Sequence, residues 1–273
     1  MAAWLFARAL SLIYLIAFVS IGVQVRGLIG ANGILPAENF VHIVDRYFGA
    51  KKFVSLPSVF LFGVNDQLLV LVCAAGAVCA LLAFAGVAQS LMFLLMWALY
   101  LSLVNVSQDF LSFQWDVLLL EAGFLAIFLA PVTAVDLNPA AAFFKAHEPP
   151  RLVYWLFLFL LFRFMFASGA VKLASGDETW RNLTAMSYHY ETQPIPNPLA
   201  WLAHQLPLWA QKLSCAAMFA IELAVPFLIF VPGRARLLAF GSLVALQTLI
   251  LATGNYAFFN WLTIALCLFL LPE

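Results

Sequence analysis

Charged side chains are scarce in this chain of 273 residues. Lys, Arg, Asp and Glu make up 10% of it, whereas soluble domains contain about 25%. The 13 basic and 13 acidic residues cancel, so the formal net charge is zero. A neutral chain lacks the basic surface that holds the phosphates of a nucleic acid. We therefore expect no nucleic-acid partner, and the low charge content indicates a protein that resides in lipid.

Cysteine and the common cofactor motifs are equally sparse. The four cysteines, Cys73, Cys79, Cys215 and Cys267, all lie inside apolar runs, where a thiol packs as a small apolar side chain. CxxC, HExxH, Walker and GxGxxG patterns are missing from the sequence, and each of these carries a known metal or nucleotide chemistry. His189 and His204 lack the paired spacing of metal ligands. We expect no metal site.

Long apolar runs are what the chain has in abundance. Hydrophobic residues make up 65% of it, 27 of them phenylalanine, and a membrane helix needs about 20 such residues in a row. The pattern predicts an all-α, polytopic integral membrane bundle with about eight transmembrane helices in a single domain, 1–273. The expected helices lie near residues 4–25, 66–85, 87–106, 111–130, 151–173, 212–231, 235–253 and 256–271.

The polar segments between these helices predict the orientation of the chain. Basic residues in short loops favour the cytoplasmic side, and the N-terminus is placed there by Arg8, Lys145, Arg151, Arg234 and Arg236. The longer segments 26–65 and 174–210 then lie outside, although the first contains four basic residues. From Pro36 onward, apolar and polar residues recur at helical spacing, which predicts a helix in the plane of the membrane interface.

Several charged and amide side chains fall inside the expected membrane helices. Counting about 1.5 Å per residue predicts an outer layer that contains Asp116 and Lys172. The same count predicts a middle layer, which consists of Glu121, Arg163, Glu222 and Gln247, with Gln114 on the helix face of Glu121. A buried charge needs a partner or a cavity, so we expect Glu121 and Arg163 to pair. Such pairs either fix the register of the helices or mark a functional site, and the sequence leaves both open.

Lys172 is the candidate catalytic residue. It follows the small residues Ser168, Gly169 and Ala170, which allow helices to approach closely, and it opens into the outer polar segment. A lysine that is partly withdrawn from water can release its proton and act as a base. The alternative is that its amine reaches up to the membrane interface without any chemical role.

The outer polar segment 174–210 concentrates charged and aromatic side chains. They form either a binding surface or part of an interfacial aromatic belt, and they are Asp177, Glu178, Trp180, Arg181, Tyr188, His189, Tyr190 and Glu191. The Pro-rich stretch 193–198 must be extended, and Asn197 with Pro198 predicts the start of a short helix. The apolar residues that follow, among them Trp201 and Trp209, suit an interface.

Four stretches of this sequence resemble the lipase maturation factor family. They are FQWDVLLLEAG at 113–123, GDETWRNLT at 176–184, YHYETQPIPNP at 188–198 and GNYAFFN at 254–260. The resemblance implies a membrane protein that assists the folding and assembly of secreted dimeric lipases, with a lipase as its partner. It implies the endoplasmic-reticulum membrane or, for a bacterial homologue, the inner membrane. It covers the membrane portion, since the family's lumenal C-terminal domain is expected to be missing here.

A shorter stretch is similar to the membrane domain of vitamin K-dependent carboxylases. There, a small-Gly-x-x-Lys-Leu motif is followed by Asp and Trp, as Ser168–Leu173 is followed here by Asp177 and Trp180. This likeness implies an enzyme with Lys172 as base, a quinol as substrate or cofactor, and a lipid or quinone within the bundle. A third alternative, a small-solute transporter, would be favoured by an inverted repeat, which the sequence does not show. Whether the protein is an enzyme stays open.

Overall fold

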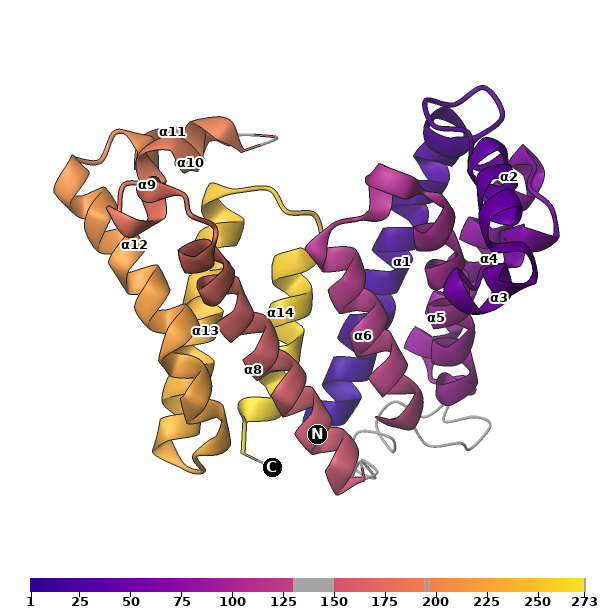
Figure 1. Cartoon of the computed structure of the whole chain (residues 1–273). Helices are drawn as coiled ribbons and strands as arrows, with labels where there is room; N and C mark the ends of the chain where they lie inside the picture. Colours follow the sequence, from indigo (N-terminus) through magenta and orange to yellow (C-terminus); the bar gives the residue numbers. More distant parts are fainter. Residues whose placement is uncertain (130–149, 194, 196, 273) are drawn as a thin grey trace. The chain divides into compact units, whose positions relative to one another are not determined.

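The computed structural model describes residues 1–129, 150–193, 195 and 197–272, and within these ranges the regular structure consists of helices with no extended strand. The chain divides into two compact units, essentially residues 3–153 and 154–273. The helices of both are labelled in Figure 1. Each unit is described by itself below. Lys145, one of the residues used to predict orientation, lies outside the described residues.

The described part of the first unit has four long helices and a segment of shorter helices between the first two of them. The long helices are α1 (Ala2–Ile29), α4 (Asp66–Ala85), α5 (Gln89–Val106) and α6 (Gln114–Leu129). Between α1 and α4 lie α2 (Ala37–Phe48), α3 (Lys52–Ser55) and 3-10 turns at Gly49–Lys51 and Val59–Phe62. A further 3-10 turn, Gln108–Leu111, precedes α6. The helix predicted after Pro36 is therefore present as α2.

Local sequence explains how α4 begins and ends. The side chain of Asn65 accepts a hydrogen bond from the backbone N–H of Leu68, which satisfies a donor that the first turn leaves without a partner. Gly86 ends the helix in the left-handed conformation, with φ of 92°, which glycine adopts at little cost. Only three residues separate α4 from α5, and the two helices pack against each other as a tight hairpin.

Aromatic side chains of α1 form the centre of the first unit. Tyr14 and Phe18 are fully buried, and both pack edge-on against Tyr100 of α5. Two glycines make room for them, because a Cβ at Gly76 would collide with the Phe18 ring and one at Gly123 with the Tyr14 hydroxyl. Small residues at these positions let α4 and α6 approach α1 closely.

The second unit contains four further apolar helices. They are α8 (Arg151–Ala174), α12 (Leu208–Leu223), α13 (Arg234–Thr253) and α14 (Phe259–Cys267). After α12, where Pro226 lacks the N–H that an α-helix needs, the chain continues as a 3-10 helix, Val225–Phe230. Another 3-10 turn, Leu268–Leu270, follows α14. The expected helix 212–231 thus begins four residues earlier and changes type near its end.

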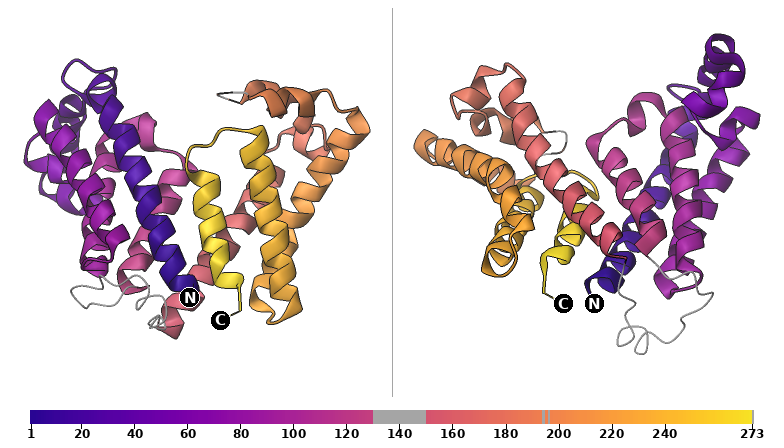
Figure 2. Two further views of the ribbon diagram at one scale, coloured as in Figure 1. Left: turned by 180° about the vertical axis from the view of Figure 1, so that it is seen from behind. Right: turned by 60° about the horizontal axis from the view of Figure 1, so that its bottom comes forward.

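Three short helices connect α8 to α12. They are α9 (Glu178–Arg181), α10 (Met186–Thr192) and α11 (Pro198–His204), and Figures 1 and 2 show α11 lying crosswise to the long helix α12. At the opposite end of the unit, the Nη1 atom of Arg236 donates to the Tyr154 hydroxyl at 3.1 Å. The start of α13 therefore lies beside the start of α8, as the shared side of Arg151 and Arg236 predicted.

The helices have the length and composition of membrane spans. Among the described residues, six are long and apolar enough to cross a bilayer, and they are α1, α4, α5, α8, α12 with its 3-10 extension, and α13. The other two expected helices are present but shorter, since α6 has 16 residues and Phe259–Leu270 is a short apolar segment. The predicted all-α, polytopic membrane protein is confirmed, whereas the single domain and the orientation stay predictions.

Candidate functional site

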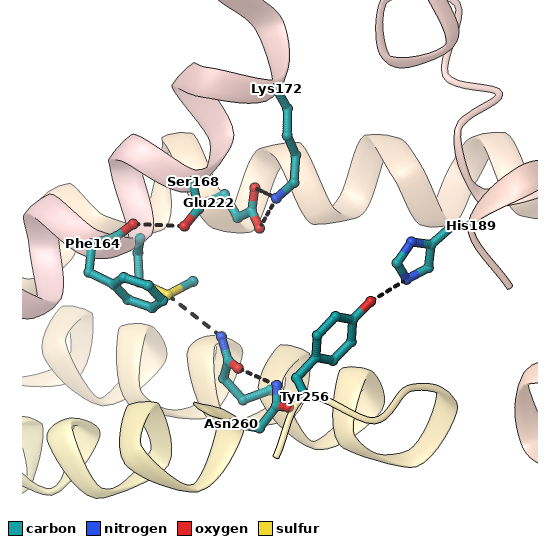
Figure 3. Close-up of polar contacts among 9 residues, drawn as sticks. Phe164, Ser168, Lys172, His189, Glu222, Tyr256 and Asn260 are labelled. Carbon is teal, nitrogen blue, oxygen red and sulfur yellow. Dashed lines mark hydrogen bonds and ion pairs between the residues drawn. The ribbon is translucent and has the colours of Figure 1, made fainter. Parts of the chain in front are cut away.

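An ion pair between two long helices forms the core of the candidate site in the second unit. The Nζ atom of Lys172 on α8 donates to both carboxylate oxygens of Glu222 on α12, each at 2.6 Å (Figure 3). The Glu222 side chain is 5% exposed and that of Lys172 is 25% exposed. Charge-assisted hydrogen bonds of this kind are roughly twice as strong as neutral ones, so the pair ties α8 to α12.

The close approach of the two helices depends on Gly169. A Cβ at this position would lie 2.8 Å from Leu223 Cδ2 and 3.0 Å from Glu222 Cβ, closer than van der Waals contact allows. The glycine therefore brings the backbone of α8 against the face of α12 that carries Glu222. This confirms the expectation that the small residues before Lys172 serve close helix packing.

The prediction that Lys172 and Glu222 lie in different polar layers is wrong. Counting residues from the expected helix ends placed Lys172 in an outer layer with Asp116, and Glu222 in a middle layer. In the structure, Lys172 pairs with Glu222 instead. The count assumed that α8 ends at the level where α12 begins. Gly169, five residues before the end of α8, is level with Glu222, fourteen residues after the start of α12.

Trp180 covers the ion pair from the outer segment. Its ring centroid lies 5.7 Å from Lys172 Nζ, and the ring packs edge-on against Phe219 of α12. Asp177 starts the single turn of α9 by accepting hydrogen bonds from the backbone N–H and the hydroxyl of Thr179, both at 2.8 Å. These bonds, the backbone one first, lower the pKa of the exposed Asp177 carboxyl. Asp177, by capping α9, thus fixes the Trp180 indole beside the Lys172 ammonium group. An aromatic ring in this position attracts a positive charge.

His189 on α10 is the second polar group at this end of the unit. Its Nε2 atom lies 3.0 Å from the hydroxyl of Tyr256, in the segment between α13 and α14 (Figure 3). Burial, and then the positive charge of Lys172, lower the pKa of His189. The unprotonated nitrogen of a neutral imidazole can accept a hydrogen bond from the tyrosine hydroxyl. Glu191, on the same short helix, lies 2.9 Å from His204 Nε2.

Two side chains that follow α10 fasten the chain to the end of α13, whereas residues 194 and 196 of the stretch predicted to be extended lie outside the described residues. Gln193 donates from Nε2 to the carbonyl of Thr253 at 2.8 Å, and Asn197 donates from Nδ2 to the carbonyl of Gly254 at 3.5 Å. A Cβ at Gly254 would lie 2.9 Å from Gln193 Oε1. The Asn197–Gly254 bond and the His189–Tyr256 contact join the stretches 188–198 and 254–260, which carried the family resemblance.

A buried pair of amides lies deeper in the same unit. Asn260 on α14 donates from Nδ2 to Gln247 Oε1 on α13 at 2.7 Å, and Gln247 Nε2 lies 3.7 Å from the sulfur of Met165 on α8 (Figure 3). Gln247 was predicted in the polar layer, but its partner was not, since Asn260 sits among apolar residues. The GNYAFFN stretch, which ends at Asn260, was the available signal for both Asn260 and Tyr256.

The other predicted intramembrane residues divide between the units. Gln114, Asp116 and Glu121 all lie on α6 in the first unit. Asp116 is fully buried and accepts a hydrogen bond at 2.6 Å from Tyr100, a partner that sequence reasoning missed. Arg163 lies on α8 in the second unit. The six residues therefore do not form one cluster within a single unit, and the pairing of Glu121 with Arg163 stays a prediction.

The remaining outer-segment candidates lie at the surface. Glu178, Arg181 and Tyr188 are exposed, and Tyr190 is half-buried, so burial raises the pKa of the Tyr190 hydroxyl. Within the described residues, no group of three or more His, Cys, Asp or Glu side chains is placed to hold a metal ion. The site is thus an ion pair under an indole, flanked by a His–Tyr hydrogen bond, with no cofactor-holding arrangement evident among these contacts.

Comparison with known proteins places this geometry in context. A family model described as the lipase maturation factor transmembrane domain matches residues 1–273. Lipase maturation factor 2 of Xenopus laevis is 50% identical over 98% of this chain and 38% of its own length. The human protein of that name is 44% identical over 98% of this chain and 40% of its own length. Mouse lipase maturation factor 1 is 36% identical over 94% of this chain and 45% of its own length.

These matches bear on both resemblances seen in the sequence. The likeness to lipase maturation factors is confirmed, and nothing in the comparisons supports the carboxylase alternative. No solved structure gives a match. The chain spans less than half the length of each of these three relatives.

Proposed function

Because the chain belongs to the lipase maturation factor family, we propose that it assists the folding or maturation of secreted lipases. The observation that carries the proposal is the match of the family's transmembrane domain to all 273 residues. The names of the vertebrate relatives indicate lipases as clients. We place the protein in the endoplasmic-reticulum membrane, where secreted lipases fold, with the segment 174–210 on the lumenal side.

The geometry of the second unit supports a role for this segment in positioning a client. Hydrogen bonds from Gln193 and Asn197 hold it against the end of α13, and Trp180 holds it against Lys172. A short connection that is fastened at several points presents its exposed side chains in a defined arrangement. Glu178, Arg181 and Tyr188 are among the exposed groups, and we propose that they face the client.

We propose a structural role for Lys172 rather than a catalytic one. Its ammonium group is engaged by both oxygens of Glu222, so the geometry is that of a latch between α8 and α12. A buried pair of this kind fixes the register of two helices without any proton transfer. The reading of Lys172 as a base on a quinol has no support from the comparisons.

The proposal can be tested by replacing the matching part of human lipase maturation factor 2 with this chain. The chimera is expressed in cells that lack lipase maturation factors, together with a secreted lipase. We expect the activity per mass of secreted lipase to recover. A chimera that reaches the membrane at the normal level and still yields inactive lipase would contradict the proposal.

Two variants of the chimera separate the site from the lipid-facing surface. Glu222→Gln breaks the ion pair, so lipase activity should fall. Val23→Ala shortens an apolar side chain that is 83% exposed on α1, and it should leave the activity unchanged. Equal amounts of both variants in the membrane are needed for the comparison.

Orientation is tested by labelling Glu178→Cys with a reagent that does not cross membranes. Since 174–210 is proposed to be lumenal, intact microsomes should protect the cysteine, and permeabilised ones should expose it. Labelling in intact microsomes would reverse the proposed orientation.

A further inference from the structure

The short helix α11 is held firmly on one side. Its first turn is capped by Asn197, which accepts from the N–H of Ala200 at 2.8 Å. Its last carbonyls, those of His204 and Leu206 just beyond, accept from the side-chain amide of Gln211 at 2.9 and 3.0 Å. Ala200 is fully buried against the unit. Hydrogen bonds therefore satisfy backbone groups at both ends of α11, and the burial of Ala200 holds its inner side against the unit.

The outer side of the same helix is apolar, and no other part of the described chain covers its side chains. Trp201 is 65% exposed and Leu202 is 56% exposed, and Leu199 and Leu206 are exposed beside them. Residues 192–211 contain no Lys, Arg, Asp or Glu. Exposed apolar side chains on an ordered helix, with no charge among them, mark a contact surface rather than one that faces water.

This apolar surface is continuous with the beginning of a membrane span. Leu208, Trp209 and Leu213, in the first turns of α12, are exposed as well, with Trp209 at 70%, and α12 is apolar enough to cross a bilayer. Figures 1 and 2 show α11 lying across the outer end of the unit, next to the start of α12. The exposed side chains of α11 thus extend the surface that α12 presents to lipid.

We propose that α11 lies in the membrane interface, with its apolar side seated among the lipid headgroups and upper acyl chains. An apolar helix side that bears an indole ring, here Trp201 of α11 with Trp209 of α12 close behind it, is typical of this depth. Lys212, exposed one residue after Gln211, extends its amine to the headgroup phosphates. The bilayer then supports the outer segment from one side, while α13 and α12 hold it from the other.

The bilayer is favoured over a client protein as the occupant because the surface continues into the lipid-facing side of a span, and no charged residue lies in the sequence between the two. A surface that binds a soluble partner has a polar rim around an apolar centre. Charged side chains stand only at its two ends, where the exposed Glu191 contacts His204 and Lys212 follows Gln211, and between Thr192 and Gln211 the sequence supplies none. The proposal concerns only where α11 lies relative to the membrane, so it holds whichever client the protein assists.

The test uses the full chain in phosphatidylcholine vesicles, with a polarity-sensitive fluorophore at Leu202→Cys. Cys79, which is half-buried, is replaced by Ala, and the other three cysteines are buried. We expect lipids carrying a nitroxide near the top of the acyl chain to quench the label, and aqueous iodide to quench it several-fold less. The matched control is the same label at Glu178→Cys, which is exposed and polar, and there the order should be reversed.

A second label at Leu206→Cys guards against a local effect of one substitution, since both positions are exposed and neither change should disturb folding. Iodide quenching at both positions equal to that at Glu178→Cys would overturn the proposal. Protection that arises only after a lipase is added would overturn it too, because the surface would then belong to the client.

Discussion

Lys172 and Glu222 are 50 residues apart in the chain, yet the lysine amine lies 2.6 Å from both carboxylate oxygens of the glutamate. The glutamate is nearly inaccessible to solvent, whereas a quarter of the lysine side chain is accessible. The pair is therefore asymmetric. The carboxylate depends on the amine for its charge balance, while the amine keeps some access to water.

This asymmetry predicts unequal effects of the two single substitutions. Lys172→Met leaves a buried, unpaired carboxylate and should lower the free energy of unfolding by about 3–5 kcal/mol, the usual cost of breaking a buried pair. Glu222→Gln leaves a lysine that can still be hydrated, so its cost should be smaller. Thermal unfolding in detergent measures both. Lys172→Met combined with Glu222→Gln should recover much of the loss, and a double variant that shows the sum of the two single losses would contradict a direct pair.

Substitution of Lys172 by Arg distinguishes the latch from a catalytic base. Arginine keeps the positive charge but does not lose its proton in proteins. If Lys172 only ties α8 to α12, Lys172→Arg should retain most of the lipase-maturation activity and most of the thermal stability. Stable, inserted protein without activity would instead restore the catalytic reading of this residue.

The sequence sufficed to predict the helices but not how their ends align. Each of the eight expected ranges contains a helix, because long apolar runs have no other stable structure in lipid. Lys172 and Glu222 were predicted in different layers but pair in the structure, since helix ends were assumed to lie at one level. Gly169 and Glu222 show that they do not. Only contacts between helices reveal such an offset.

Two polar side chains that lie within apolar stretches were not predicted as hydrogen-bond partners. Tyr100, which donates to Asp116, and Asn260, which donates to Gln247, sit in runs of hydrophobic residues. Their helical periodicity carries no information about a buried hydrogen bond, because any core residue would satisfy it. Asn260 and Tyr256 both lie in the stretch 254–260, which was noted for its resemblance to a family, and the structure brings Tyr256 against His189 of the stretch 188–198.

Gly123 should be intolerant of even a methyl group. A Cβ at this position would collide with the hydroxyl of Tyr14, which is fully buried and bonds to the carbonyl of Leu119 at 3.1 Å. Overpacking of this kind costs about 1–3 kcal/mol. Gly123→Ala should therefore lower the unfolding temperature, whereas Gly241→Ala, at a helical glycine with open space around its Cβ position, should not. Equal stability of both variants would argue against this packing.

Acidification should weaken the contact between His189 and Tyr256. Burial, followed by the charge of Lys172, lowers the pKa of His189 below its usual value of 6.5, so the folded protein holds the neutral ring while the unfolded chain takes up a proton first. The stability from this group is therefore present above about pH 6.5 and is lost as the pH falls through the lowered pKa. Hydrogen exchange of residues 188–193 should become faster over that range.

The neighbouring charges do not mimic this effect. The pKa of Asp177 is lowered by its hydrogen bonds to Thr179, so the charge of its carboxylate is lost only at far more acidic pH. His189→Gln keeps a polar side chain without a titrating ring, so its exchange rates should vary less between pH 7.5 and 5.5. If wild type and His189→Gln accelerate equally on acidification, the pH response resides elsewhere, and His189 is not the group that loosens the outer segment.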